Sequence, residues 1–237
     1  MTALTQPPPN LPTPPPDREA LRFRRKAARI WWLGGISIGF CLLVIGVPLV
    51  LRQRSNADMS EAMGNMRSVG MMLLEFDNEY GEFPNATTAA DVKKATATTL
   101  TLGTWSSNQL FRQLLAGGGG KSEKPFWAKT AISPRKPDDI FNTDATALAP
   151  GECGFAYIVG QNTFDLETPL LVAPLLPGKL AFDPKPFKGM AVVLQIDNSV
   201  RSYPIDKHGR VILNGLNLFD PRQPFWKGKT PDIKWPE

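Results

Sequence analysis

An uninterrupted apolar segment constrains this chain more than any other feature of its sequence. Residues 30–51, IWWLGGISIGFCLLVIGVPLVL, form a run of 22 residues without one charged side chain. A helix needs about 20 apolar residues to cross the hydrocarbon core of a bilayer. A buried helix of a water-soluble protein seldom lacks charge over such a length. The segment is therefore predicted to be a transmembrane helix.

A cleaved secretory signal peptide is the main alternative. Its apolar core would span about 7–15 residues and would end at a small-residue cleavage site. The run here is longer, and no A-x-A pattern follows it. We therefore expect a retained single-pass anchor. The anchor residues that we single out are Trp31, Trp32, Phe40, Leu43, Pro48 and Leu51.

The distribution of charge orients the predicted anchor. The chain has a net charge of +5, but residues 1–29 alone hold six basic and two acidic residues, and the remainder holds 21 and 20. Flanking Lys and Arg residues stay in the cytoplasm. The N-terminus is therefore predicted to be cytoplasmic and the bulk of the chain to lie outside. Because the basic excess is confined to this tail, no nucleic-acid partner is expected.

The tail at 1–29 is basic and rich in proline. Seven prolines fall within residues 1–16, which predicts an extended, low-complexity segment. A plain cytoplasmic spacer is the favoured interpretation of this composition. A docking site for a partner that binds polyproline helices is the alternative.

A stem helix is predicted over residues 52–84, where Gly81 supplies a C-terminal stop and Pro84 supports it. Apolar residues recur there at spacings of three and four, which is one face of a helix. Asp58 or Ser60 would cap it if the helix breaks after the membrane, and otherwise span and stem would form one rod of about 50 residues. Its apolar face either packs on the chain's own sheet or binds a partner. The face consists of Met59, Met63, Met66, Val69 or Gly70, Leu73, Phe76 and Tyr80.

Residues 85–237 are predicted to form one α+β domain. A weak helix is expected over 91–102 and a clear one over 107–116, with Ser106 or Ser107 as its cap. Strands follow, with Asp197 and Asn198 as a two-residue hairpin turn and an extended tail along the surface at the C-terminal end. Because the predicted helices come first in the chain and the predicted strands follow, the order of elements favours an α+β fold in which the stem helix packs on an antiparallel sheet. The expected strands are 155–159, 169–175, 190–196, 199–205 and 211–213.

The end of the stem, NMRSVGMMLLEFDNEYGEFP at 65–84, resembles the type IV pilin-like and type II secretion pseudopilin-like proteins of bacteria. Residues 107–127 look like the helix and loop of the same group, and residues 190–203 look like its terminal hairpin. The positions that fit the group are Asn65, Arg67, Gly70, Tyr80, Gly81, Phe83, Pro84, Gly189 and Asp197.

This resemblance implies a pilin-like fold and a non-enzymatic, structural or accessory role in a type II secretion or type IV pilus-like system. It places the chain in a bacterial inner membrane, with its C-terminal domain in the periplasm. Pilin-like or secretion-platform proteins are the implied partners. Assembly of the chain with its own copies, into a homo-oligomer or a filament, is a further alternative. The alternative is a membrane-anchored periplasmic binding module that uses the fold without forming filaments.

The chain departs from the pattern of the group at the cleavage site. Prepilins are cut after a Gly and carry a Glu at the fifth mature position. Five residues beyond the candidates Gly34, Gly35 and Gly39 stand Gly39, Phe40 and Val44, and the apolar segment holds no Glu. We therefore expect an anchor that is not cleaved. Phe187 also replaces a His that many members carry, and Asn198 replaces a Gly.

A glycine-rich stretch, GGGGKS at 117–122, looks like a phosphate-binding loop. That loop needs a further Gly where Leu115 stands, and it should follow a strand and open a helix. This stretch follows a predicted helix instead. No nucleotide site is therefore expected.

A small group of polar residues in the 121–150 region, Asp138, Asp139, Asn142 and Asp144, offers oxygen ligands. Some pseudopilins bind calcium, so the resemblance makes a calcium site the alternative here. The spacing matches no calcium loop. A solvated loop is the favoured interpretation, and no cofactor or metal is predicted.

Catalytic chemistry finds little support in the sequence. His208 lies in DKHGR, which has the composition of an exposed turn. Cys41 belongs to the apolar segment and Cys153 to the outer domain, so they cannot form a disulfide with each other. Cys153 is predicted to be a small buried residue. No catalytic residue is assigned.

Overall fold

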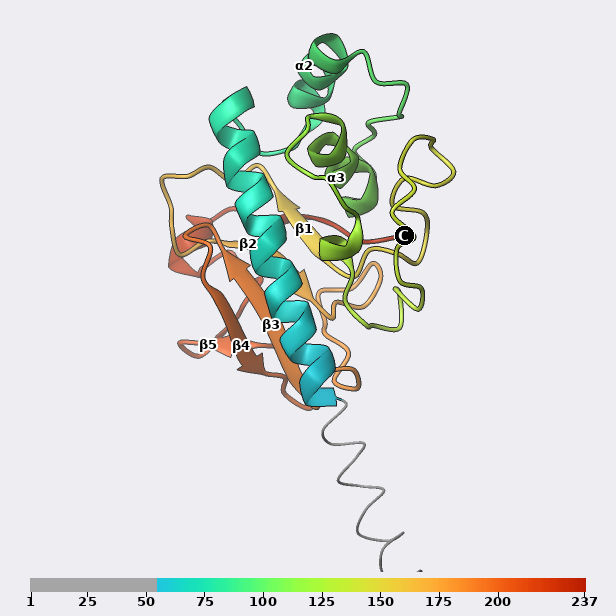
Figure 1. Ribbon diagram of the computed structural model, residues 1–237. Helices are drawn as coiled ribbons and strands as arrows, with labels where there is room; N and C mark the ends of the chain where they lie inside the picture. Colours follow the sequence, from blue (N-terminus) through green and yellow to red (C-terminus); the bar gives the residue numbers. More distant parts are fainter. Residues whose placement is uncertain (1–54) are drawn as a thin grey trace, which may run out of the picture. The chain divides into compact units, whose positions relative to one another are not determined.

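The computed structural model describes residues 55–237, which form an α+β fold of helices and an antiparallel sheet (Figure 1). The predicted tail at 1–29 and the apolar segment at 30–51, with all its anchor residues, lie outside the described residues. Within 55–237, no helix combines the length and the apolar character that a membrane span requires.

The stem helix is continuous over residues 55–80. Neither Asp58 nor Ser60 caps a separate helix, because the chain is already helical at residue 55. The predicted end at Gly81 is confirmed. This glycine adopts a left-handed φ of +80°, and its N–H donates to the carbonyl of Asp77 at 2.7 Å.

Two short helices follow, α2 (Ala86–Thr96) and α3 (Ser107–Ala116). The sequence predicts the first over 91–102, but it begins earlier, because the Asn85 side chain accepts the N–H groups of Thr87 and Thr88. It ends where Ala97 adopts a left-handed φ of 53°. The second has its predicted bounds, and the Ser106 hydroxyl accepts the N–H of Gln109 as the cap.

The main sheet has five antiparallel strands in the order β4-β3-β2-β1-β7. A separate two-stranded ribbon, β5 (Ile212–Leu213) with β6 (Leu216–Asn217), follows β4 in the chain. Two 3-10 turns, η1 (Lys124–Phe126) and η2 (Pro224–Trp226), complete the elements. The strands of the main sheet are β1 (Ala156–Val159), β2 (Pro169–Ala173), β3 (Met190–Gln195), β4 (Val200–Pro204) and β7 (Asp232–Lys234).

Both faces of the three central strands β1, β2 and β3 are buried, because these strands are apolar on both sides. On one face, Leu171 and Leu194 belong to the same core as the stem helix, which crosses the sheet in Figure 1. Met66, Val69 and Leu73 of the stem are fully buried in that core. The apolar face of the stem therefore packs on the chain's own sheet, one of the two predicted alternatives.

The C-terminal segment corrects a prediction. The sequence predicts an extended tail along the surface, but the segment supplies the edge strand β7, where Ile233 pairs with Ile158 of β1. Trp226 is 4% exposed in the core on the second face of the sheet, and its indole N–H donates to the Leu218 carbonyl at 2.6 Å. A sheet that is apolar on both sides needs this second covering layer.

The hairpin between β3 and β4 also differs from the prediction. Its loop has three residues, 196–198, and not two, because the Gln195 N–H donates to the Ser199 carbonyl at 2.9 Å. Asn198 adopts a left-handed φ of 62°, and its N–H donates to the Gln195 carbonyl. This is a turn followed by one left-handed residue, the usual geometry of three-residue hairpin loops.

Candidate functional site

Gly70 allows the stem helix to approach the β3–β4 hairpin closely. A Cβ atom at this position would lie 2.2 Å from Oδ1 of Asn198 and 2.9 Å from Cδ2 of Leu194. Real Cβ atoms do not approach other atoms so closely. Glycine at position 70 is therefore required by the packing of the helix on the hairpin.

A loop after η1 runs along one side of the stem helix. Asn65 donates from Nδ2 to the carbonyl of Trp127 at 2.8 Å. Toward the N-terminal end of the stem, Lys129 pairs with Asp58 at 3.0 Å, and Lys136 pairs with Glu61 at 3.0 Å. These partners lie three and four residues apart on the helix, so they share one side of it. Arg67, in contrast, is exposed.

The end of the stem is fixed by aromatic residues. Tyr80 stacks on Phe76 with ring centroids 4.5 Å apart, and Phe83 is buried. The carbonyl of Pro84 accepts the hydroxyl of Tyr157 at 3.1 Å. Tyr157 is fully buried, and burial raises its pKa far above the usual value. These positions therefore join the stem to β1.

Gly189 and Asp197, singled out from the sequence by resemblance, lie at opposite ends of β3. Gly189 precedes the strand with a φ of +76°, and its carbonyl accepts the Ile205 N–H at 2.7 Å. Asp197 lies in the hairpin loop, where its carboxylate accepts the Ser199 N–H at 2.8 Å. Phe187, which stands where many pilin-like proteins carry a His, is a core residue that is 1% exposed. The structure does not bring these three residues together into one site.

The glycine-rich stretch terminates α3. The Gly117 N–H donates to the Gln113 carbonyl at 2.8 Å, and the Gly120 N–H donates to the Leu114 carbonyl at 3.0 Å. Two amides of the stretch thus satisfy the last carbonyls of a helix. The hydroxyl of Ser122 donates to Asp139 at 2.7 Å.

The acidic residues of the 121–150 region have separate partners. Asp139 pairs with Lys124 at 2.6 Å, and this contact contributes most to lowering its pKa to about 2. Asp138 accepts the N–H of Ile140 at 2.8 Å. Throughout residues 55–237, no three or more His, Cys, Asp or Glu side chains are grouped as metal ligands.

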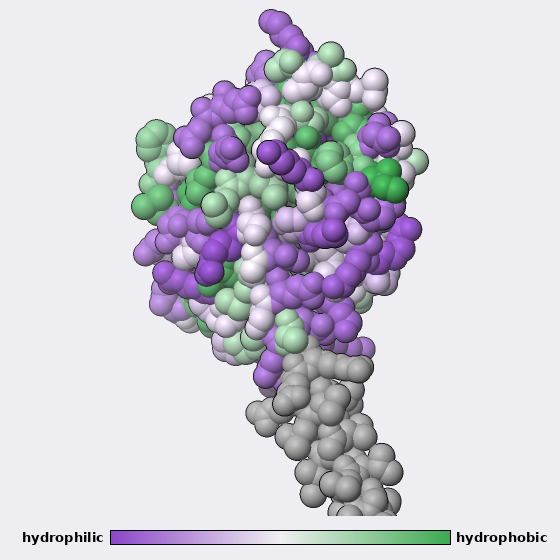
Figure 2. All heavy atoms as spheres, in the orientation of Figure 1, coloured by the Kyte–Doolittle hydropathy of each residue, from purple (hydrophilic) through white to green (hydrophobic). Residues whose placement is uncertain are grey.

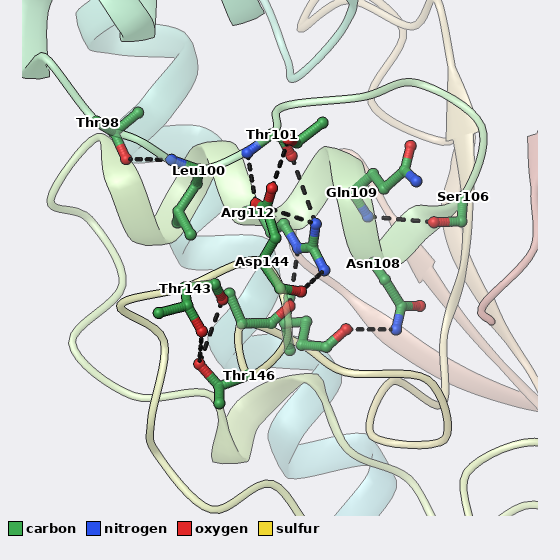
Figure 3. Close-up of polar contacts among 12 residues, drawn as sticks. Thr98, Leu100, Thr101, Ser106, Asn108, Gln109, Arg112, Thr143, Asp144 and Thr146 are labelled. Atoms are coloured by element: carbon green, nitrogen blue, oxygen red, sulfur yellow. Dashed lines mark hydrogen bonds and ion pairs between the residues drawn. The ribbon is translucent and has the colours of Figure 1, made fainter.

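Arg112 of α3 is the centre of a polar network that joins α3 to two irregular segments (Figure 3). The side chain is buried, and Nε donates to the Ala147 carbonyl at 2.7 Å. Nη2 donates to the Asp144 carbonyl at 2.9 Å, and Nη1 lies 3.7 Å from the carboxylate of Asp144. That carboxylate accepts the N–H and hydroxyl of Thr101, which lower its pKa. One arginine therefore holds two irregular segments against α3.

A pair of buried carboxyl groups has no counterpart among the residues singled out from the sequence. Glu123 is fully buried just before η1, and Glu152 is 5% exposed. Burial is the main cause that raises the pKa of Glu123 to about 7, and it raises the pKa of Glu152 as well. Both residues fall in polar, irregular stretches of sequence, where no local pattern marks a glutamate as buried.

His208 and Cys153, the remaining residues considered for chemistry, lie in a turn and in the core. His208 is exposed in the turn before β5, where the Asp206 carboxylate accepts its backbone N–H at 2.8 Å. Cys153 is fully buried beside Ser107, as predicted, and burial raises the pKa of its thiol to about 11. The thiol is therefore protonated and poorly nucleophilic at neutral pH.

Comparison with models of protein families, with curated proteins and with solved structures finds no match for this chain.

Proposed function

We propose that the chain is a non-enzymatic, single-pass membrane protein that resembles pseudopilins and serves as a structural or accessory component of a type II secretion or type IV pilus-like system. The observation that carries the proposal is the stem helix at 55–80 laid on an antiparallel sheet, with Gly70 seated against the terminal hairpin. In the sequence this helix closely follows a charge-free segment of 22 residues, which fits a bilayer-spanning anchor.

In the proposed pilin-like fold, the positions that match the family motif have structural roles. Gly70 permits the close approach of helix and hairpin, Gly81 ends the stem, and the carbonyl of Pro84 binds a buried tyrosine. None of these positions contributes a nucleophile or a general base. This supports a role in assembly or binding more than a role in catalysis.

A specific observation favours a second candidate, the membrane-anchored periplasmic binding module without a filament. The outward side of the stem is polar, with Arg67, Glu75 and Glu79 exposed. Figure 2 shows mostly purple, white and pale-green atoms along it. Met71, 62% exposed, is the one strongly exposed large apolar side chain between residues 55 and 80. Such a surface offers little apolar area for packing against copies of the same helix.

Cross-linking in intact cells, followed by capture of the tagged full chain from detergent-solubilised membranes, tests both candidates. The proposal predicts that pilin-like or secretion-platform proteins are recovered with the chain. A tagged single-pass protein of similar size without a pilin-like domain is the control. If the chain retains its membrane location but recovers none of these proteins beyond the control, the result contradicts a role in secretion and favours the membrane-anchored binding module.

A further inference from the structure

Two buried carboxyl groups bind successive amides of one loop. Glu123 accepts the N–H of Leu148 through Oε1. Glu152 accepts the N–H of Ala149 through Oε2 at 2.9 Å. Neither Leu148 nor Ala149 belongs to a helix or strand, so these carboxyl groups replace the hydrogen bonds of regular structure.

The second oxygen of Glu123 has no such partner. Oε2 is buried, and it makes no hydrogen bond to any described residue. A buried oxygen without a partner is costly, and the cost is greater when the group is charged. A protonated carboxyl tolerates this position better than a carboxylate does.

The charged groups around Glu123 add to this preference. The carboxyl groups of Glu152, Asp138 and Asp139 all act on Glu123 with the same sign of charge. Lys124 pairs with Asp139 at 2.6 Å and not with Glu123, and Arg135 acts on Glu152. No ion pair of Glu123 with a cation is found within 55–237.

The loop itself is under backbone strain at the point of contact. Leu148 adopts a left-handed φ of 42°, which is unfavourable for a residue with a branched side chain. The bond from its N–H to Glu123 therefore helps to hold a conformation that the backbone does not favour. The same segment supplies the carbonyls of Ala147 and Asp144 that bind Arg112 of α3.

We propose that Glu123 is a pH-dependent latch for the segment 138–152. With its carboxyl protonated, Glu123 stays buried and the segment is closed over η1 and α3. When the pH rises above neutral, the proton passes to water and the carboxylate becomes hydrated by opening the segment. Opening separates Glu123 from the Leu148 N–H and weakens the contacts between Arg112 and the same segment.

Hydrogen exchange of the full chain in detergent, read by mass spectrometry at pH 5.5 and pH 8 and corrected for intrinsic rates, tests the latch. A pKa near 7 in the closed state and near 4.5 in the open state predicts a loss of protection in peptides covering 145–151 of about tenfold or more from pH 5.5 to pH 8. Peptides within α3 should change less.

Glu123→Gln removes the charge and keeps an oxygen that accepts the Leu148 N–H. The variant should lose the pH dependence and stay protected at pH 8, whereas Glu79→Gln on the exposed side of the stem should behave like the wild type. An equal pH dependence in the wild type and Glu123→Gln overturns the latch. If Glu123→Gln does not fold, unchanged protection of 145–151 in the wild type between the two pH values overturns it.

Discussion

Gly70 of the stem helix lies directly against Asn198 of the β3–β4 hairpin, and the space between them admits no side chain. A Cβ atom on residue 70 would come within 2.2 Å of Oδ1 of Asn198. The other helical glycine of the stem, Gly64, has nothing within 4 Å of the position that a Cβ atom would occupy there. The two glycines therefore form a natural pair for testing how the stem and the sheet pack.

Gly70→Ala should destabilise the full chain by about 1–2 kcal/mol, because the cost of displacing the side chains of Asn198 and Leu194 exceeds the gain in helix propensity. Gly64→Ala should instead stabilise it by about 0.5–1 kcal/mol, through the higher helix propensity of alanine. Thermal unfolding in detergent measures both effects. Adding Asn198→Gly to Gly70→Ala should recover part of the loss, since glycine suits the left-handed φ of 62° at residue 198.

Arg112→Met should cost about 2–4 kcal/mol of unfolding free energy, because it leaves the Ala147 and Asp144 carbonyls without their buried donor. Arg67→Met on the exposed side of the stem should change stability by less than about 0.5 kcal/mol. Chemical denaturation of the two variants, followed by tryptophan fluorescence, makes the comparison. Equal losses in both would mean that the network around Arg112 does not tie the irregular segments to α3.

Tyr157→Phe should cost about 1–2 kcal/mol, because the Pro84 carbonyl loses its hydroxyl donor inside the core. Tyr203→Phe on β4 is the matched control, since Tyr203 is half-buried and makes no hydrogen bond through its hydroxyl among the described residues. Urea midpoints at constant m-value give both losses. If Tyr157→Phe leaves the stability unchanged, the hydrogen bond from Tyr157 to Pro84 does not help to hold the end of the stem against β1.

The global stability should fall as pH rises from about 5 to about 7. Glu123 has a pKa of about 7 when folded and 4.5 as the ordinary value, so the folded state binds the additional proton in this window. Protonation therefore favours the folded state, by up to about 3 kcal/mol. Denaturation profiles of wild type and Glu123→Gln should converge near pH 5 and separate near pH 8, with the variant more stable at pH 8.

Elements with a strong local pattern could be predicted from the sequence. The α3 helix shows apolar residues on one face and a serine cap, and Gly81 and Pro84 mark the end of the stem. The strand cores around Leu171 and Val193 are evident as apolar runs. These features depend on residues close together in the chain, where periodicity and turn chemistry act.

Features that depend on distant residues could not be predicted in the same way. The edge strand β7 is only three residues long and lies between Pro231 and Pro236 in the sequence. Only its pairing with β1 makes it a strand. The apolar runs of β1 to β3 did contain a signal, because a sheet that is apolar on both sides needs a second layer. The environment of Glu123 comes from residues distant in the chain, such as Leu148, which lies 25 positions away.

Intact-mass analysis of the protein extracted from bacterial membranes tests most directly the claim that the chain is held by an uncleaved single-pass anchor. A retained, uncleaved anchor predicts recovery from the membrane fraction at the mass of the 237-residue chain, 26.1 kDa. A mass that lacks the residues up to Gly34, Gly35 or Gly39 would contradict it and would indicate standard prepilin processing.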